Sequence, residues 1–176
     1  MSATPLRVSD LVDAAMTASG ILWIDTGERT YAAWHAWAGE PGEGGAGVGA
    51  GGGRGPTAYL LNGPGEQHLP WLPQEVVVVL RSRDTGGRLL RLRARRDVLD
   101  PADPEWEVAA AALSAKRVGA TPQLLETWRQ QCTVSALRPF GEPLEVPGRH
   151  TDERVSVPVA SWHGAAGGAP RRPGAG

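Results

Sequence analysis

Short apolar runs, and runs in which apolar and polar residues alternate, recur along most of the chain. Both patterns are typical of β-strands when Gly, Pro, Asn or Asp residues bound them. Turn residues at 26–28 and at 83–87 join two pairs of these runs into hairpins. The predicted strands are Ile21–Asp25, Arg29–Trp37, Thr57–Asn62, Glu75–Ser82, Arg88–Val98 and Cys132–Leu137.

Three other segments have the 3.6-residue period of amphipathic helices. One is Ser9–Thr17, and another begins at Thr121-Pro122 and ends near Gln130. The clearest begins at Asp103-Pro104-Glu105, where an aspartate cap precedes a proline and an acidic first turn. Few helices separate the strands, so the order favours a mainly β fold with flanking helices over a doubly wound parallel sheet. We expect an antiparallel barrel of about six strands. The apolar stripe predicted for the clearest helix is Trp106, Ala109, Ala110, Leu113 and Val118.

The remaining segments divide the chain into one domain and its extensions. Residues 1–138 form the predicted barrel domain, and residues 38–56 within it are glycine-rich and are expected to form a flexible hairpin loop. A Walker-type phosphate loop would end in Gly-Lys-Ser/Thr, but Arg54-Gly55-Pro56 stands there. We expect an irregular C-terminal extension at 139–162, in which 154–162 is extended, and a disordered tail at 163–176.

Composition and charge exclude several classes of function. The formal net charge of −1 gives no overall positive field to attract nucleic acid or an anionic membrane. The single cysteine, Cys132, excludes an intrachain disulfide and any multi-cysteine metal site. No secretory leader and no apolar run of ~18 residues is visible, so a cytoplasmic protein is expected. Lys116 is the only lysine, and Gly and Pro are abundant, which is typical of a GC-rich genome such as that of an actinobacterium.

Four segments in this order resemble one known family. They are the first hairpin, ILWIDTGERTYAAWHAW, then AYLLNGPGEQ, then VVVVLRSRD, and finally DPEWEVAAAALSAKR. Together they resemble the split β-barrel family of pyridoxamine 5′-phosphate oxidase and its FMN- and deazaflavin-binding relatives, over residues 11–137. The resemblance implies a six-stranded antiparallel split barrel, a homodimer, and an FMN or deazaflavin coenzyme bound between subunits. It also implies a small oxidoreductase, in which the coenzyme carries the hydride chemistry.

The candidate cofactor site follows from the glycine loop and its neighbours. Backbone N–H groups of such a loop can approach a phosphate or a ring edge, although Asn-Gly and Pro-Gly also form ordinary turns. Many family members hold the FMN phosphate after this loop with a serine and a basic residue, but this chain has Glu66, Gln67 and His68 there. An alternative is therefore a non-catalytic binding or interaction module that has lost its phosphate ligands. The candidate cofactor-binding residues are Asn62, Gly63, Gly65, Gln67, His68, His35 and Arg81.

Several alternatives stay open for these residues. His35 lies between Trp34 and Trp37, so it could contact a stacked flavin or belong to an aromatic core or dimer interface. A haem ligand role for His35 and His68 is a further hypothesis. The arginines of the second hairpin could contact an anionic ligand or could simply form a solvated strand face. The homodimer prediction rests on tryptophans on both faces of Arg29–Trp37. The pattern identifies no catalytic residue and no metal site.

Overall fold

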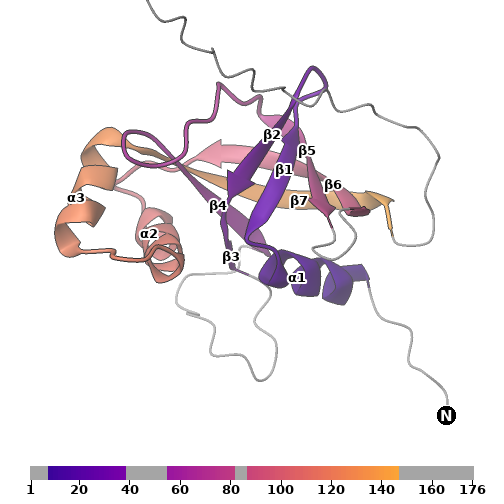
Figure 1. Ribbon diagram of the computed structural model, residues 1–176, viewed down its shortest axis with the longest axis horizontal. Helices are drawn as coiled ribbons and strands as arrows, with labels where there is room; N and C mark the ends of the chain where they lie inside the picture. The colour runs from indigo at the N-terminus through magenta and orange to yellow at the C-terminus, as the bar shows by residue number, and fades with distance from the viewer. Residues whose placement is uncertain (1–7, 39–54, 82–86, 147–176) are drawn as a thin grey trace, which may run out of the picture.

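The computed structural model describes residues 8–38, 55–81 and 87–146 (Figure 1). The glycine-rich segment 39–54, the turn at 82–86 and the tail from 147 onward lie outside the described residues, as do the predictions made for them. The helices are α1 (Val8–Ala18), α2 (Pro104–Lys116) and α3 (Pro122–Gln131). The strands are β1 (Ile21–Asp25), β2 (Thr30–Trp34), β3 (Ala36–Ala38), β4 (Thr57–Asn62), β5 (Glu75–Arg81), β6 (Arg88–Val98) and β7 (Thr133–Glu145).

One bent segment closes the sheet into a barrel. The strand order is β2-β1-β5-β6-β7-β4-β3, and all neighbours are antiparallel. The two outermost strands, β2 and β3, are consecutive in the sequence and are separated only by His35. The first half of this segment pairs with β1 and the second half with β4, so the bend at His35 joins the two edges of the sheet. The predicted mainly β, antiparallel fold with flanking helices is confirmed.

Two details of the predicted barrel were wrong. The sheet has seven strands and not six, because the expected strand Arg29–Trp37 is interrupted at His35. The extension predicted to be irregular from residue 139 is instead strand as far as Glu145. There it pairs with β6, with Phe140 opposite Arg93 and Glu145 opposite Arg91.

Apolar residues form two cores on opposite sides of the sheet. Inward-facing residues of the strands, such as Leu22, Val78 and Leu90, fill the barrel together with Val12 and Met16 of α1. Outward-facing residues of β4 and β7 pack instead against α2 and α3, which lie together on one side of the barrel (Figure 1). The second core contains Ala36, Tyr59, Leu61, Leu99, Trp106, Ala109, Ala110, Leu113, Trp128, Val134 and Ala136.

The helix ends follow the predicted capping chemistry. The Asp103 carboxylate accepts a hydrogen bond from Glu105 N at 2.8 Å, and the Thr121 hydroxyl accepts one from Leu124 N at 3.2 Å. Helix α2 ends at Lys116, so Val118 lies beyond it and is 91% exposed, and its predicted place in the apolar stripe was wrong. None of the helices in the described part of the chain is long and apolar enough to span a membrane.

Candidate functional site

The loop after β4 uses its polar groups to hold its own shape. The Asn62 side chain pairs with the backbone of Leu69, donating from Nδ2 to Leu69 O (3.2 Å) and accepting at Oδ1 from Leu69 N (2.8 Å). Gly63 N donates to Gln67 O at 3.2 Å, and Glu66 N donates to Gly63 O at 3.1 Å. The backbone N–H groups of Gly63 and Glu66 are therefore engaged within the loop, as in an ordinary structural turn.

Gln67 attaches this loop to the edge of the sheet. Its Oε1 accepts a hydrogen bond from Trp34 N at 2.9 Å, and its Nε2 donates to Trp34 O at 3.0 Å. The side-chain amide thus pairs with the exposed edge of β2 as a neighbouring strand would, which satisfies two backbone groups at once. His68 and Gly65, in the same loop, are exposed.

Glu66 is a buried carboxylate that joins the loop to both helices of the second core. Its side chain is 4% exposed, and its oxygens accept from Arg117 Nε at 3.1 and 3.2 Å and from Trp128 Nε1 at 3.0 Å. In the sequence Glu66 looked like a carboxylate that would repel a phosphate. Its partners lie 51 and 62 residues away, so no local pattern could have revealed this structural role.

Gly63 packs tightly against Cys132 at the end of α3. A Cβ atom on Gly63 would lie 2.7 Å from Cys132 Sγ and 2.9 Å from its Cα, so only glycine fits there. Burial raises the pKa of the Cys132 thiol, and the nearby Glu66 carboxylate raises this pKa further. The thiol therefore stays protonated at neutral pH, as in a structural rather than a nucleophilic cysteine.

His35 is enclosed at the bend where the barrel closes. It is 3% exposed, and its Nε2 lies 3.2 Å from Met16 O of α1, so Nε2 carries the hydrogen and donates it. Nδ1 is buried and has no hydrogen-bond partner among the described residues. Trp37 is also covered by α1, since its Nε1 donates to Asp13 Oδ1 at 2.7 Å. These contacts assign His35 to the closure of the barrel.

Burial lowers the pKa of His35, which makes the stability of the fold pH-dependent. The unfolded chain binds a proton near pH 6.5 and the folded chain only at lower pH, so stability is fully present above about 6.5 and is lost as pH falls. Below about pH 6.5 we expect protonation of His35 in the unfolded chain to lower the free energy of unfolding by up to about 1.4 kcal/mol per pH unit. Urea unfolding between pH 7.5 and 5.5 should show a smaller loss for His35→Gln than for the unaltered chain. His68→Gln, at an exposed site, should leave the slope unchanged, and equal slopes for all three chains would contradict this prediction.

A strip of outward-facing residues on β1, β2 and β5 borders the Gln67 loop. The strand pairs Ile21–Trp34, Trp23–Ala32 and Trp23–Val79 place these side chains on one outer face. The Arg81 guanidinium lies over the Trp23 ring, 5.2 Å from its centroid. Trp23 and Trp34 are half-buried and Ile21 is 44% exposed. We call this the outer strip; it comprises Ile21, Trp23, Ala32, Trp34, Val79 and Arg81.

Much of the positive charge of the arginine-rich hairpin is neutralised within the chain. Arg91 lies 3.1 Å from Glu145 and 3.6 Å from Asp25, and Arg88 lies 3.4 Å from Glu145. Glu145 comes from the part of β7 that was predicted to be irregular. Arg88 and Arg91 are thus half-buried and ion-paired within the chain, and Arg81 of the same hairpin lies over Trp23 in the outer strip. No group of three potential metal ligands occurs among residues 8–38, 55–81 and 87–146.

Comparisons with known proteins give similarity at the level of the fold. No family model matches the sequence, and no curated protein matches it. The chain is similar to the crystal structure of HutZ, described as a heme storage protein, from Vibrio cholerae, with a TM-score of 0.48 and 12% identity over 78% of this chain and 94% of that one. It is also similar to a putative pyridoxamine 5′-phosphate oxidase from Listeria innocua, with a TM-score of 0.42 and 14% identity over 78% and 98% of the two chains. At these values neither structure transfers a ligand or a residue role to this chain.

Proposed function

We propose that this chain is a split-barrel protein that binds a flavin or deazaflavin coenzyme on the outer strip. The observation that supports this most directly is the pairing of Trp23 with the Arg81 guanidinium beside the apolar side chains of the strip. A planar ring can stack on an indole, and a guanidinium can pair with a phosphate or a ring carbonyl. When bound, the coenzyme would supply hydride transfer, and the protein would act as a small oxidoreductase.

The residues of the chain fit this coenzyme unequally. Trp23 and Trp34 offer an aromatic surface, and Arg81 offers a positive charge at one end of it. The loop contributes less than the sequence suggested, because Asn62, Gly63 and Gln67 use their polar groups within the protein. Of the predicted cofactor-binding residues in the loop, Gly65 and His68 are exposed. His35 is enclosed under α1 and would not contact a ligand on the strip.

Absorption and fluorescence titration with FMN and with a deazaflavin coenzyme tests the proposal. We expect a spectral change with at least one of them, and Trp23→Leu should weaken binding about 3- to 10-fold because one stacking surface is lost. Trp71→Leu is the matched control, because Trp71 is 81% exposed on the connection between β4 and β5, outside the strip. Equal affinity of the two variants would exclude the strip as the site. No spectral change and no thermal shift with either coenzyme would exclude flavin binding.

A second candidate function is a non-catalytic interaction module that acts as a homodimer. The self-satisfied loop favours it, because a loop whose donors bond within the protein offers little to a phosphate. α1 covers Trp37 and the second core partly covers Trp34, so a dimer would instead use the exposed part of the outer strip. Calorimetry that is silent with both flavins and with hemin, alongside a dimer in sedimentation at micromolar concentration, would favour the module over the flavoprotein.

A further inference from the structure

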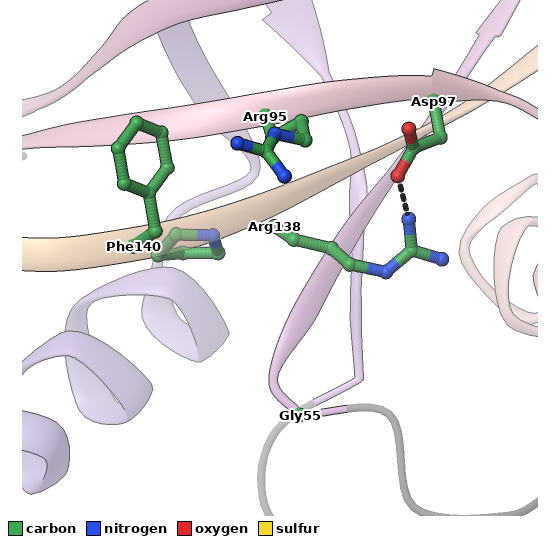
Figure 2. A pocket seen from close by; sticks show the side chains of 6 residues that line it. Gly55, Arg95, Asp97, Arg138 and Phe140 are labelled. Carbon is green, nitrogen blue, oxygen red and sulfur yellow. Dashed lines mark hydrogen bonds and ion pairs between the residues drawn. The ribbon is translucent and has the colours of Figure 1, made fainter.

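A hollow of about 460 Å³ lies on the outside of the barrel, where β7 runs beyond the start of β4. Figure 2 shows Arg95 and Asp97 on β6 beside Phe140 and Arg138 on β7, with Gly55 below them at the start of β4. Its volume is within the range of small-molecule sites, roughly 300–1,000 Å³. None of its lining residues belongs to the outer strip. The described residues that line it are Gly55, Arg95, Asp97, Arg138, Pro139 and Phe140.

Two arginines on neighbouring strands line this hollow. The register places Arg95 directly opposite Arg138, and like charges in such a pair repel each other. Arg138 is neutralised by ion pairs with Asp97 and Glu105. The ion pair of Arg95 within the described residues is with Glu75 at 3.7 Å, and the two side chains are 57% and 63% exposed. Solvent screens such a pair, so the positive charge of Arg95 is largely available to a ligand.

An apolar wall stands beside this charge. The Arg95 guanidinium lies 5.8 Å from the centroid of the Phe140 ring, and Phe140 is 36% exposed with Pro139 next to it. A guanidinium binds a carboxylate with two parallel hydrogen bonds, and an aromatic ring prefers to pack on another ring or on proline. Because Asp97 and Glu105 neutralise Arg138, the exposed Arg95 guanidinium supplies the positive charge beside this wall, which suits a ligand with one negative charge.

We propose that this hollow binds a small aromatic carboxylate, with its carboxylate at Arg95 and its ring against Phe140. Arg138 keeps its ion pairs with Asp97 and Glu105, so the charge that meets the ligand is that of Arg95. This proposal is independent of the flavin proposal, because it uses other strands of the outer face, β6 and β7, and other residues.

Isothermal titration calorimetry with benzoate, acetate and benzamidine tests this site. We expect benzoate to bind about tenfold or more tightly than acetate, which lacks the ring, and than benzamidine, which carries the opposite charge. Arg95→Gln should weaken benzoate binding about tenfold, because it removes a charged hydrogen-bond partner, and Phe140→Leu several-fold. Arg29→Gln makes the same change of charge at an exposed turn and should bind benzoate like the unaltered chain.

Three results would overturn the proposal. They are equal binding of benzoate and acetate, equal binding by Arg95→Gln and Arg29→Gln, and loss of benzoate binding in Trp23→Leu. The third result would place the ligand on the outer strip instead. Arg95 is exposed, so its replacement should leave the fold intact, and circular dichroism melting of each variant checks this. Failure of flavin to bind would leave the benzoate result unaffected.

Discussion

Replacing Gly63 with alanine is expected to lower the free energy of unfolding by about 3 kcal/mol or more. The new Cβ would lie 2.7 Å from Cys132 Sγ and 2.9 Å from Cys132 Cα, and the backbone φ of +156° is one that L residues rarely adopt. The clash with the backbone of Cys132 matters most, because this residue lies between the end of α3 and the start of β7 and its backbone cannot move without moving both. Urea unfolding followed by circular dichroism measures the effect.

Two controls separate crowding from backbone strain. Gly65→Ala has a positive φ of +77° and nothing within 4 Å of the new Cβ, so it should cost only about 1 kcal/mol. Gly63→Ala combined with Cys132→Ala removes the clash with Sγ but keeps the clash with the backbone of residue 132, so stability should recover only in part. If Gly63→Ala were no worse than Gly65→Ala, close packing against Cys132 would not be the reason for glycine at this position.

The sequence predicts local elements of this fold better than their connections. The hairpin turn at 26–28 could be predicted because residues close in the sequence hold it. Thr26 N donates to Arg29 O at 3.0 Å, and Gly27 N donates to Asp25 Oδ1 at 2.8 Å. The closure of the barrel was not found, because it depends on a break at His35 that has no local marker. An apolar pattern fixes which residues face inward, but it does not say where one strand changes partners.

The end of β7 shows how sheet pairing can override residue preference. Pro139, Gly141 and Pro143 made this segment look irregular in the sequence. Pairing of β7 with β4 ends at Leu137, so beyond it β7 has β6 as its neighbour on one side only. A proline is tolerated on such a one-sided strand, because fewer of its backbone groups need to donate to a ladder.

The loop chosen as the candidate site keeps its place beside the sheet edge, but its polar groups are used within the protein. The resemblance directed attention to Asn62–His68, and that loop does border the exposed aromatic strip through Gln67 and Trp34. The partners of this loop come from distant segments: Glu66 accepts from Arg117, the C-cap residue of α2, and from Trp128 of α3. Trp23, which the proposed site uses, was not among the predicted residues, since one tryptophan in a short apolar strand looks like a core residue.

Replacing Glu66 with alanine is expected to cost about 2–3 kcal/mol of unfolding free energy. The Trp128 indole is fully buried, so its Nε1–H would lose its acceptor with no water to replace it. Arg117 loses its carboxylate as well, but its side chain is 37% exposed and can turn to water, which keeps the cost at the lower end for a buried pair. Glu66→Gln keeps an acceptor for the indole and should cost only about 1 kcal/mol.

Glu75→Ala is the matched control for this effect, since it also removes a glutamate that pairs with an arginine. Glu75 is 63% exposed and lies 3.7 Å from Arg95, so its loss should change stability by less than about 0.5 kcal/mol. Trp128→Phe removes the indole donor, and a double-mutant cycle with Glu66→Ala should give a coupling of about 1 kcal/mol or more. Equal effects of Glu66→Ala and Glu75→Ala would mean that burial of the carboxylate does not stabilise the junction between the loop and the two helices. A clear difference would identify Glu66 as the structural centre of that junction, which explains why a carboxylate occupies a loop where a phosphate ligand was expected.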